Sequence, residues 1–111
     1  MSDDSNPNLE EVKKTYRLID DNFDTVYAQC NADQKKQLIA SRDAARDAFW
    51  RAVAENLTDD HGLVAQTYAD LQAANKKIQD DLEGLQNVSA FLDTVAQGVK
   101  LAGALVTLAA A

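Results

Sequence analysis

Apolar side chains recur three and four residues apart along most of the chain, the spacing that gathers them on one face of an α-helix. The first such series runs from Leu9 to Cys30 without interruption. Its members are Leu9, Val12, Tyr16, Ile19, Phe23, Val26 and Cys30. The series predicts one helix over residues 8–30, after a flexible and polar N-terminus at residues 1–7. Because Cys30 lies on the buried side of this series, we expect a core thiol.

A second helix is predicted over residues 32–57. Asn31 and Gln34 match the capping-box pattern that starts a helix. The apolar stripe of this helix is broader than that of the first, and comprises Leu38, Ile39, Ala45, Phe49, Trp50, Val53 and Leu57. We interpret Trp50, the only tryptophan, as an anchor at the edge of the core.

The longest series begins at Val64 and keeps the same alternation for more than six heptads. Its members are Val64, Tyr68, Leu71, Asn75, Ile78, Leu82, Leu85, Ser89, Leu92, Ala96, Val99, Gly103, Val106 and Ala110. Asn75 is an amide in a row that is otherwise apolar or small. Such an amide can fix the register or the oligomeric state of a helical assembly, or can be a buried polar group that reaches water.

This series is expected to comprise two helices, over residues 62–84 and 88–111. A single helix would be roughly 70 Å long at about 1.5 Å per residue, which is too long for a compact domain of 111 residues. Gly84 and Asn87 supply a helix stop and a new cap. One continuous rod, packed as an extended hairpin, is the alternative.

The last 28 residues carry only two charged side chains, Asp93 and Lys100. Their polar stripe is narrow and comprises Asp93, Gln97, Lys100, Ala104 and Thr107. A helix that is apolar around most of its circumference is central to a core or lies in a membrane. Burial shared with a second copy or a partner helix would cover it, so we expect a homo-oligomer or a helical partner. The expected interaction residues are Asn75, Ser89, Leu92, Ala96, Val99, Leu101, Gly103, Leu105, Val106 and Leu108.

Insertion of residues 88–111 into a membrane is an alternative that the sequence does not favour. The uncharged stretch from Leu101 to Ala111 would be about 16 Å long as a helix, against a hydrocarbon core of about 30 Å. A longer span would place Asp93 and Lys100 at or inside the boundary, at a cost of several kcal/mol each. Conditional insertion, with the polar stripe turned toward a pore, remains the alternative function.

Composition supports one small all-α domain at residues 8–111: a helical bundle or an extended helical hairpin of three to four helices with coiled-coil-like seams. The chain has 19 alanines, four glycines and one proline. A net charge of −7 argues against nucleic acid as a partner. The same charge leaves a further alternative, an acidic adaptor or immunity-type protein that binds a basic partner. With one cysteine and no signal-peptide pattern, the default expectation is a cytoplasmic protein, although export by a route without a signal stays open.

The sequence lacks the combination of a nucleophile, a base and an orienting group that catalysis requires. The chain has one histidine and one cysteine, and its acidic pairs are adjacent in sequence, so they diverge by about 100° on a helix. No phosphate-binding loop or zinc-ligand spacing is present. We therefore expect a non-enzymatic interaction protein without a metal, a cofactor or a small-molecule ligand.

Overall fold

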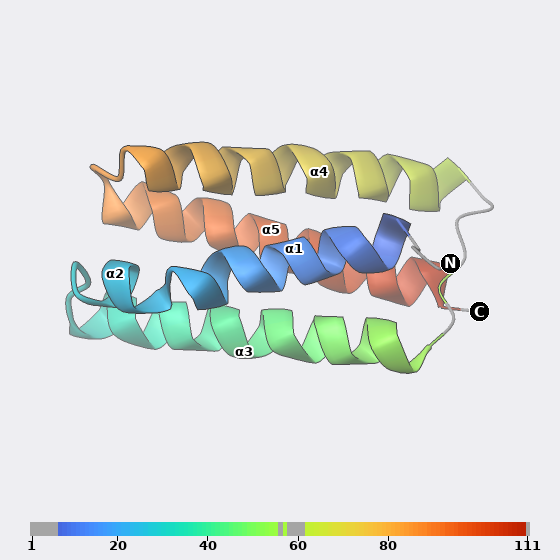
Figure 1. Ribbon diagram of the computed structural model, residues 1–111, viewed down its shortest axis with the longest axis horizontal. Helices are drawn as coiled ribbons and strands as arrows, with labels where there is room; N and C mark the ends of the chain where they lie inside the picture. The colour runs from blue at the N-terminus through green and yellow to red at the C-terminus, as the bar shows by residue number, and fades with distance from the viewer. Residues whose placement is uncertain (1–6, 56, 58–61, 111) are drawn as a thin grey trace.

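The computed structural model describes residues 7–55, 57 and 62–110, and these residues form five α-helices (Figure 1). The helices are α1 (Pro7–Asp21), α2 (Phe23–Tyr27), α3 (Ala32–Ala54), α4 (Gly62–Glu83) and α5 (Val88–Ala109). Within the described residues the only β-type pairing is an isolated antiparallel bridge between Leu57 and Ala110. The all-α prediction is confirmed. The flexible N-terminus predicted at residues 1–7 lies outside the described residues except for Pro7, which begins α1.

The four long helices lie lengthwise in a bundle of 41 × 24 × 22 Å. Helices α1 and α5 pack against each other, and each of them also packs against both α3 and α4. Figure 1 shows α3 and α4 on opposite sides of the α1–α5 pair. The two central helices therefore have three long neighbours each, whereas α3 and α4 keep a broad outer face toward solvent.

The helix expected at residues 8–30 is divided, and this division explains why five helices are present where three to four were predicted. The α-helix stops at Asp21, and α2 begins after Asn22. The Asn22 side-chain Nδ2 donates a hydrogen bond of 2.8 Å to the carbonyl oxygen of Leu18. An asparagine amide that bonds to the backbone in this way competes with helix propagation. The apolar series continues through the break, because Val26 and Cys30 remain buried.

Helix α3 starts as the sequence predicted. Asn31 Oδ1 accepts a hydrogen bond from Gln34 N at 2.8 Å, and Gln34 Oε1 accepts one from Asn31 N at 2.9 Å, which completes the capping box. The helix ends at Ala54, before the expected boundary at residue 57, and Leu57 pairs with Ala110 instead.

The inward face of α3 consists mainly of small side chains, which allow close approach to α1 and α5. Its buried residues are Leu38, Ser41, Ala45, Ala48 and Ala52. The prediction that Trp50 anchors the core edge is wrong, because this residue is 59% exposed. Trp50 lies two positions from both Ala48 and Ala52, and at 3.6 residues per turn this places it about 160° from either of them.

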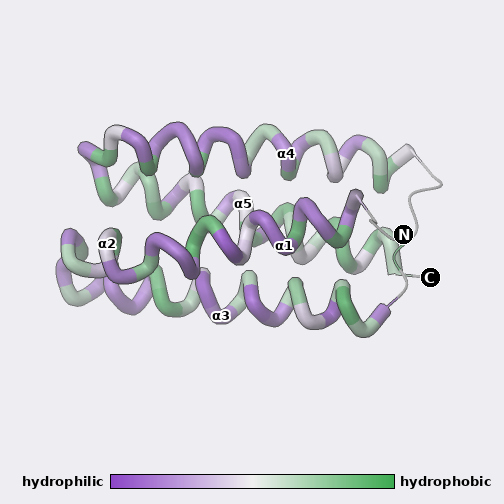
Figure 2. The backbone as a smooth tube through the Cα atoms, in the orientation of Figure 1, coloured by the Kyte–Doolittle hydropathy of each residue, from purple (hydrophilic) through white to green (hydrophobic). Residues whose placement is uncertain are grey.

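The C-terminal series turns back on itself as two helices. Helix α4 ends at Glu83, and α5 begins at Val88 after Asn87, whose side chain accepts a hydrogen bond of 3.0 Å from Ala90 N. The two helices then pack tightly at Gly98, where an added Cβ would lie 3.0 Å from Ile78 Cδ1. The hydropathy colouring in Figure 2 shows α5 as the most hydrophobic helix, while α1 and α4 carry long hydrophilic stretches.

Candidate interaction surfaces

Three of the residues that the sequence assigned to interaction lie instead in the core of the bundle. Leu92, Leu105 and Val106 of α5 are completely buried, with 0% exposure. They belong to the two clusters of core side chains that fill the bundle from end to end. In the folded chain these three residues are therefore covered by α1, α3 and α4 and do not face a partner.

The remaining members of the predicted interaction set on α5 do not share one surface. Ser89 and Ala96 are exposed. The others are half-buried, and these are Val99, Leu101, Gly103 and Leu108. Val99, Leu101 and Leu108 pack against the core clusters, so they extend the interior of the bundle.

The narrow polar stripe of α5 faces solvent. All five of its members are exposed, and these are Asp93, Gln97, Lys100, Ala104 and Thr107. Arg51 Nη2 of α3 donates a hydrogen bond of 3.3 Å to Thr107 Oγ1 at the edge of this stripe. The apolar circumference of α5 is thus covered by its own chain, and its solvated surface is polar or small.

Helix α5 is also the one helix in the described part of the chain that is long and apolar enough to cross a membrane. The core helix of a bundle meets the same requirements of length and composition. The burial of Leu92, Leu105 and Val106 shows which of these environments the folded chain provides.

Asn75 lies between α1 and α4, where it is completely buried. Its Nδ2 donates hydrogen bonds to Glu11 Oε2 at 2.8 Å and to the Glu11 carbonyl oxygen at 3.1 Å. Its Oδ1 accepts a hydrogen bond of 2.8 Å from Thr15 Oγ1. Glu11 is only 8% exposed, so its side chain depends on this amide for a partner that replaces water. The hydrogen bonds of Asn75 therefore fix α4 against α1 within one chain.

A second row of side chains on α3 carries most of the exposed large hydrophobic side chains in the described residues. We call Lys36, Ile39, Asp43, Arg46, Trp50 and Val53 the outer row of α3. Among the described residues, four large hydrophobic side chains are exposed, and three of them belong to this row: Ile39 at 37%, Trp50 at 59% and Val53 at 50%. The fourth, Leu63, begins α4.

The outer row is spaced 3-4-3-4-3 and lies opposite the buried row of the same helix. In the sequence, Ile39, Trp50 and Val53 were assigned to one broad core-facing stripe. A second series in the sequence could have separated these three residues from the core-facing ones. The buried residues of α3 have their own 3-4-3-4 spacing, and these are Leu38, Ser41, Ala45, Ala48 and Ala52. Of these two series, the structure buries one and leaves the other exposed.

Trp50 belongs to a series of aromatic ring contacts that extends from α3 to α1. Its ring lies 5.3 Å from the Phe49 ring at an interplanar angle of 45°. Phe49 in turn stacks on Tyr16 of α1 at 5.8 Å and 11°. One turn before Trp50, Arg46 Nη2 lies 3.6 Å from Asp43 Oδ1, and both side chains are about half exposed. The outer row therefore combines a fixed aromatic group with a solvated ion pair.

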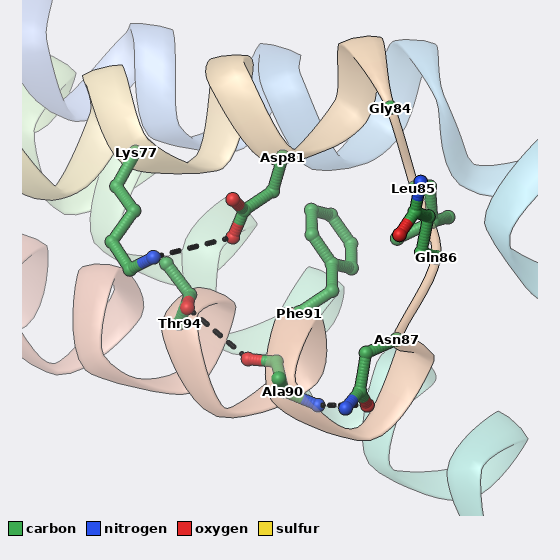
Figure 3. A pocket seen from close by; sticks show the side chains of 9 residues that line it. All are labelled: Lys77, Asp81, Gly84, Leu85, Gln86, Asn87, Ala90, Phe91 and Thr94. Carbon is green, nitrogen blue, oxygen red and sulfur yellow. Dashed lines mark hydrogen bonds and ion pairs between the residues drawn. The ribbon is translucent and has the colours of Figure 1, made fainter.

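A small cavity of about 180 Å³ lies beside the turn from α4 to α5 (Figure 3). Lys77 Nζ lies 3.7 Å from Asp81 Oδ2 there, Thr94 Oγ1 donates to the Ala90 carbonyl oxygen at 3.1 Å, and the Asn87 side chain caps α5. These polar groups bond to one another, so they do not converge on a common point where a ligand would be recognised.

Titratable groups in the described residues do not assemble into a reactive or metal-binding site. Burial raises the pKa of the Cys30 thiol, and the nearby Lys35 offsets part of that effect. No group of three histidine, cysteine, aspartate or glutamate side chains capable of holding a metal ion occurs in the part of the chain that the structure describes. His61 lies outside that part.

Comparisons with family models, with curated proteins and with solved structures give no significant match to this chain. The evidence for function is therefore the surface that the folded chain itself presents.

Proposed function

We propose that this protein is a non-enzymatic helical interaction protein, and that its docking surface is the outer row of α3. The observation that carries the proposal is the alignment of Ile39, Trp50 and Val53, three exposed large hydrophobic side chains, in one row of a single helix. Single apolar residues scattered on a surface are ordinary, but a row of them indicates a contact.

The spacing of the row specifies a helix as the binding element. From Lys36 to Val53 the row extends about 26 Å at roughly 1.5 Å per residue. Residues three and four apart along such a length form the knobs that fit between side chains of a facing helix. Tryptophan is among the residues that contribute most to protein–protein binding, and Trp50 lies within the row rather than at its end.

This proposal moves the interaction surface from α5 to α3. The apolar groups of α5 already have partners in α1, α3 and α4, so they supply little further binding energy to a folded protein. In the part of the chain that the structure describes, the outer row of α3 has no such cover.

Site-specific photo-crosslinking in the native cells tests the proposal. Val53 would be replaced by p-benzoylphenylalanine, and Leu63 would be replaced in the same way as a control that is equally exposed but lies on α4. We expect an adduct of defined mass from position 53 that disappears when Trp50→Ala is added, and none from position 63. Equal labelling from both positions, or an adduct at 53 that is insensitive to Trp50→Ala, would refute the proposal.

A second candidate function is conditional insertion of α5 into a membrane, favoured by the length and apolar composition of this helix. Insertion would require the bundle to open, because Leu92, Leu105 and Val106 lie in its interior. Dye leakage from anionic and neutral liposomes, measured from acidic to neutral pH, tests this candidate. Leakage that is unchanged by Trp50→Ala would support insertion, whereas a lack of leakage and of co-flotation with lipid at every pH would eliminate it.

A further inference from the structure

We infer that the helix which covers the outer row of α3 is α3 of a second copy, packed antiparallel to the first in a symmetric dimer. This inference rests on the proposed function, since it names the occupant of the same docking surface. It is carried by the order of charged and apolar residues along the row.

The row pairs with itself in one antiparallel register. In an antiparallel helix pair, a and d positions of one helix lie opposite d and a positions of the other. Lys36, Asp43 and Trp50 occupy one of these position types, and Ile39, Arg46 and Val53 the other. When Asp43 lies opposite Arg46 of the second copy, Ile39 lies opposite Trp50 and Lys36 opposite Val53.

Two-fold symmetry repeats each of these layers. The centre of the contact then contains two Asp43–Arg46 pairs between copies, beside the pair that each copy already forms within its own helix at 3.6 Å. The Ile39–Trp50 layers enclose this centre on both sides. At the ends, the methylene groups of Lys36 cover Val53 while the ammonium group reaches water.

Other alignments of the same helix oppose like charges or mix charged with apolar groups. A parallel pair places Asp43 opposite Asp43 and Arg46 opposite Arg46, and like-charge juxtaposition disfavours association. Shifting the antiparallel register by one heptad in one direction places Asp43 opposite Val53 and Arg46 opposite Trp50. Shifting it in the other direction places Lys36 opposite Arg46.

The charge distribution of the whole chain also favours α3 as the contact between copies. Helix α3 carries five basic and three acidic residues, a balance of +2. The chain has 11 basic and 18 acidic residues, so the remainder holds six basic and 15 acidic ones, a balance of −9. A dimer that meets through α3 keeps the strongly acidic parts of the two copies away from each other.

The position of α3 leaves room for this contact. Helices α1 and α5 pack on the inner side of α3, and α3 forms one side of the bundle (Figure 1). Because each copy contributes a single helix, we expect a dimer that dissociates on dilution.

The first experiment measures mass and tryptophan emission together. The absolute mass of the purified full chain would be followed by light scattering across a concentration series, and the emission maximum of Trp50, the only tryptophan, would be recorded at each concentration. We expect a change from monomer to dimer accompanied by a blue shift of the emission. A monomer at all concentrations, or a dimer without the shift, would overturn the inference.

Charge reversal tests the register. Asp43→Arg and Arg46→Asp each oppose like charges across the two-fold axis, and we expect each to weaken the dimer roughly tenfold or more. The variant that carries both reversals restores the opposite-charge layers and should dimerise like the native chain. A mixture of the two single variants should form heterodimers. These residues are half exposed, so circular dichroism should confirm that all variants fold.

Directed crosslinking tests the antiparallel direction. In a Cys30→Ala background, Lys36→Cys and Val53→Cys chains should form a disulfide with each other when mixed, and neither should pair efficiently with its own kind. Like-with-like disulfides, or dimerisation that is insensitive to the charge reversals, would refute the antiparallel contact. If the chain stays monomeric while photo-crosslinking at position 53 yields a foreign adduct that depends on Trp50, the second copy is eliminated as occupant and the proposed function stands.

Discussion

Replacing Asn75 with leucine tests whether this residue sets an oligomeric state or holds α4 against α1 within one chain. The interpretation that it reaches water is wrong, because Asn75 is completely buried. If Asn75 set the oligomeric state of a helical assembly, leucine would increase stability and change the mass of the assembly. In the structure the Asn75 amide instead bonds to Glu11 and Thr15 of the same chain. We therefore expect Asn75→Leu to destabilise the folded monomer.

The expected loss follows from the contacts. Leucine has the branched shape and the number of side-chain heavy atoms of asparagine but bulkier methyl groups, so no cavity is created and the cost comes mainly from the polar groups that lose a partner. The hydrogen bond from Asn75 Nδ2 to the Glu11 carboxylate is of the charge-assisted kind, which contributes roughly 1.5–3 kcal/mol. Thr15 Oγ1, whose single proton bonds to Asn75 Oδ1 in the native chain, can donate it instead to the Glu11 carbonyl oxygen at 3.1 Å, so its loss is small. Because Glu11 is buried, water replaces little of the lost bonding, and we expect a net loss of about 2–3 kcal/mol.

Chemical denaturation monitored by circular dichroism measures this change in the free energy of unfolding. For a domain of this size, 2–3 kcal/mol corresponds to a fall of roughly 8–20 °C in the melting temperature. Glu11→Gln is the matched control, because its amide oxygen can still accept the Asn75 hydrogen bond, and it should cost less than about 1 kcal/mol. An Asn75→Leu chain that is as stable as the native protein, or more stable, would refute the network as the reason for this residue.

Three further predictions concern packing and reactivity. Gly103→Ala should stabilise the chain by about 0.5–1 kcal/mol, since an added Cβ meets no atom within 4 Å. Gly98→Ala should destabilise it by about 1 kcal/mol, because its Cβ meets a buried isoleucine methyl group at 3.0 Å. Urea titrations of the two variants measure both changes in the free energy of unfolding. Leu105→Asp should prevent folding, with a loss above about 4 kcal/mol, while Ala104→Asp on the solvent stripe of α5 should be tolerated, as thermal melts will show. The raised pKa of the Cys30 thiol should make its reaction with a disulfide reagent at neutral pH slower than that of a free cysteine, with the rate still rising above pH 9.

Local chemistry made several features of this fold predictable. The capping box at Asn31 depends on side chains within one turn, and so does the cap that Asn87 provides for α5. The division of the first helix was missed because the apolar series runs through Asn22 unchanged. The structure shows that an asparagine on the flank of such a series can interrupt the backbone while the buried face continues.

Periodicity alone could not decide which face of α3 is buried, because both rows of this helix have helical spacing. The row with the larger side chains, which include Ile39 and Trp50, would be the natural choice for a core. The structure buries the row of alanines instead. Since α1 and α5 lie close together and fill the centre, α3 has to approach both of them, and only small side chains permit that approach.

The same geometry explains why the apolar C-terminal helix does not require a partner. A helix with two neighbours would leave much of the apolar circumference of α5 in water. With α1, α3 and α4 all packed on it, α5 exposes the stripe from Asp93 to Thr107 and a few small side chains beside it, among them Ser89 and Ala96. The large hydrophobic side chains for which this bundle has no room, Trp50 foremost, remain on the outside of α3. The order in which the helices pack therefore determines which apolar side chains stay exposed, and in the proposed assembly this makes α3 the contact surface.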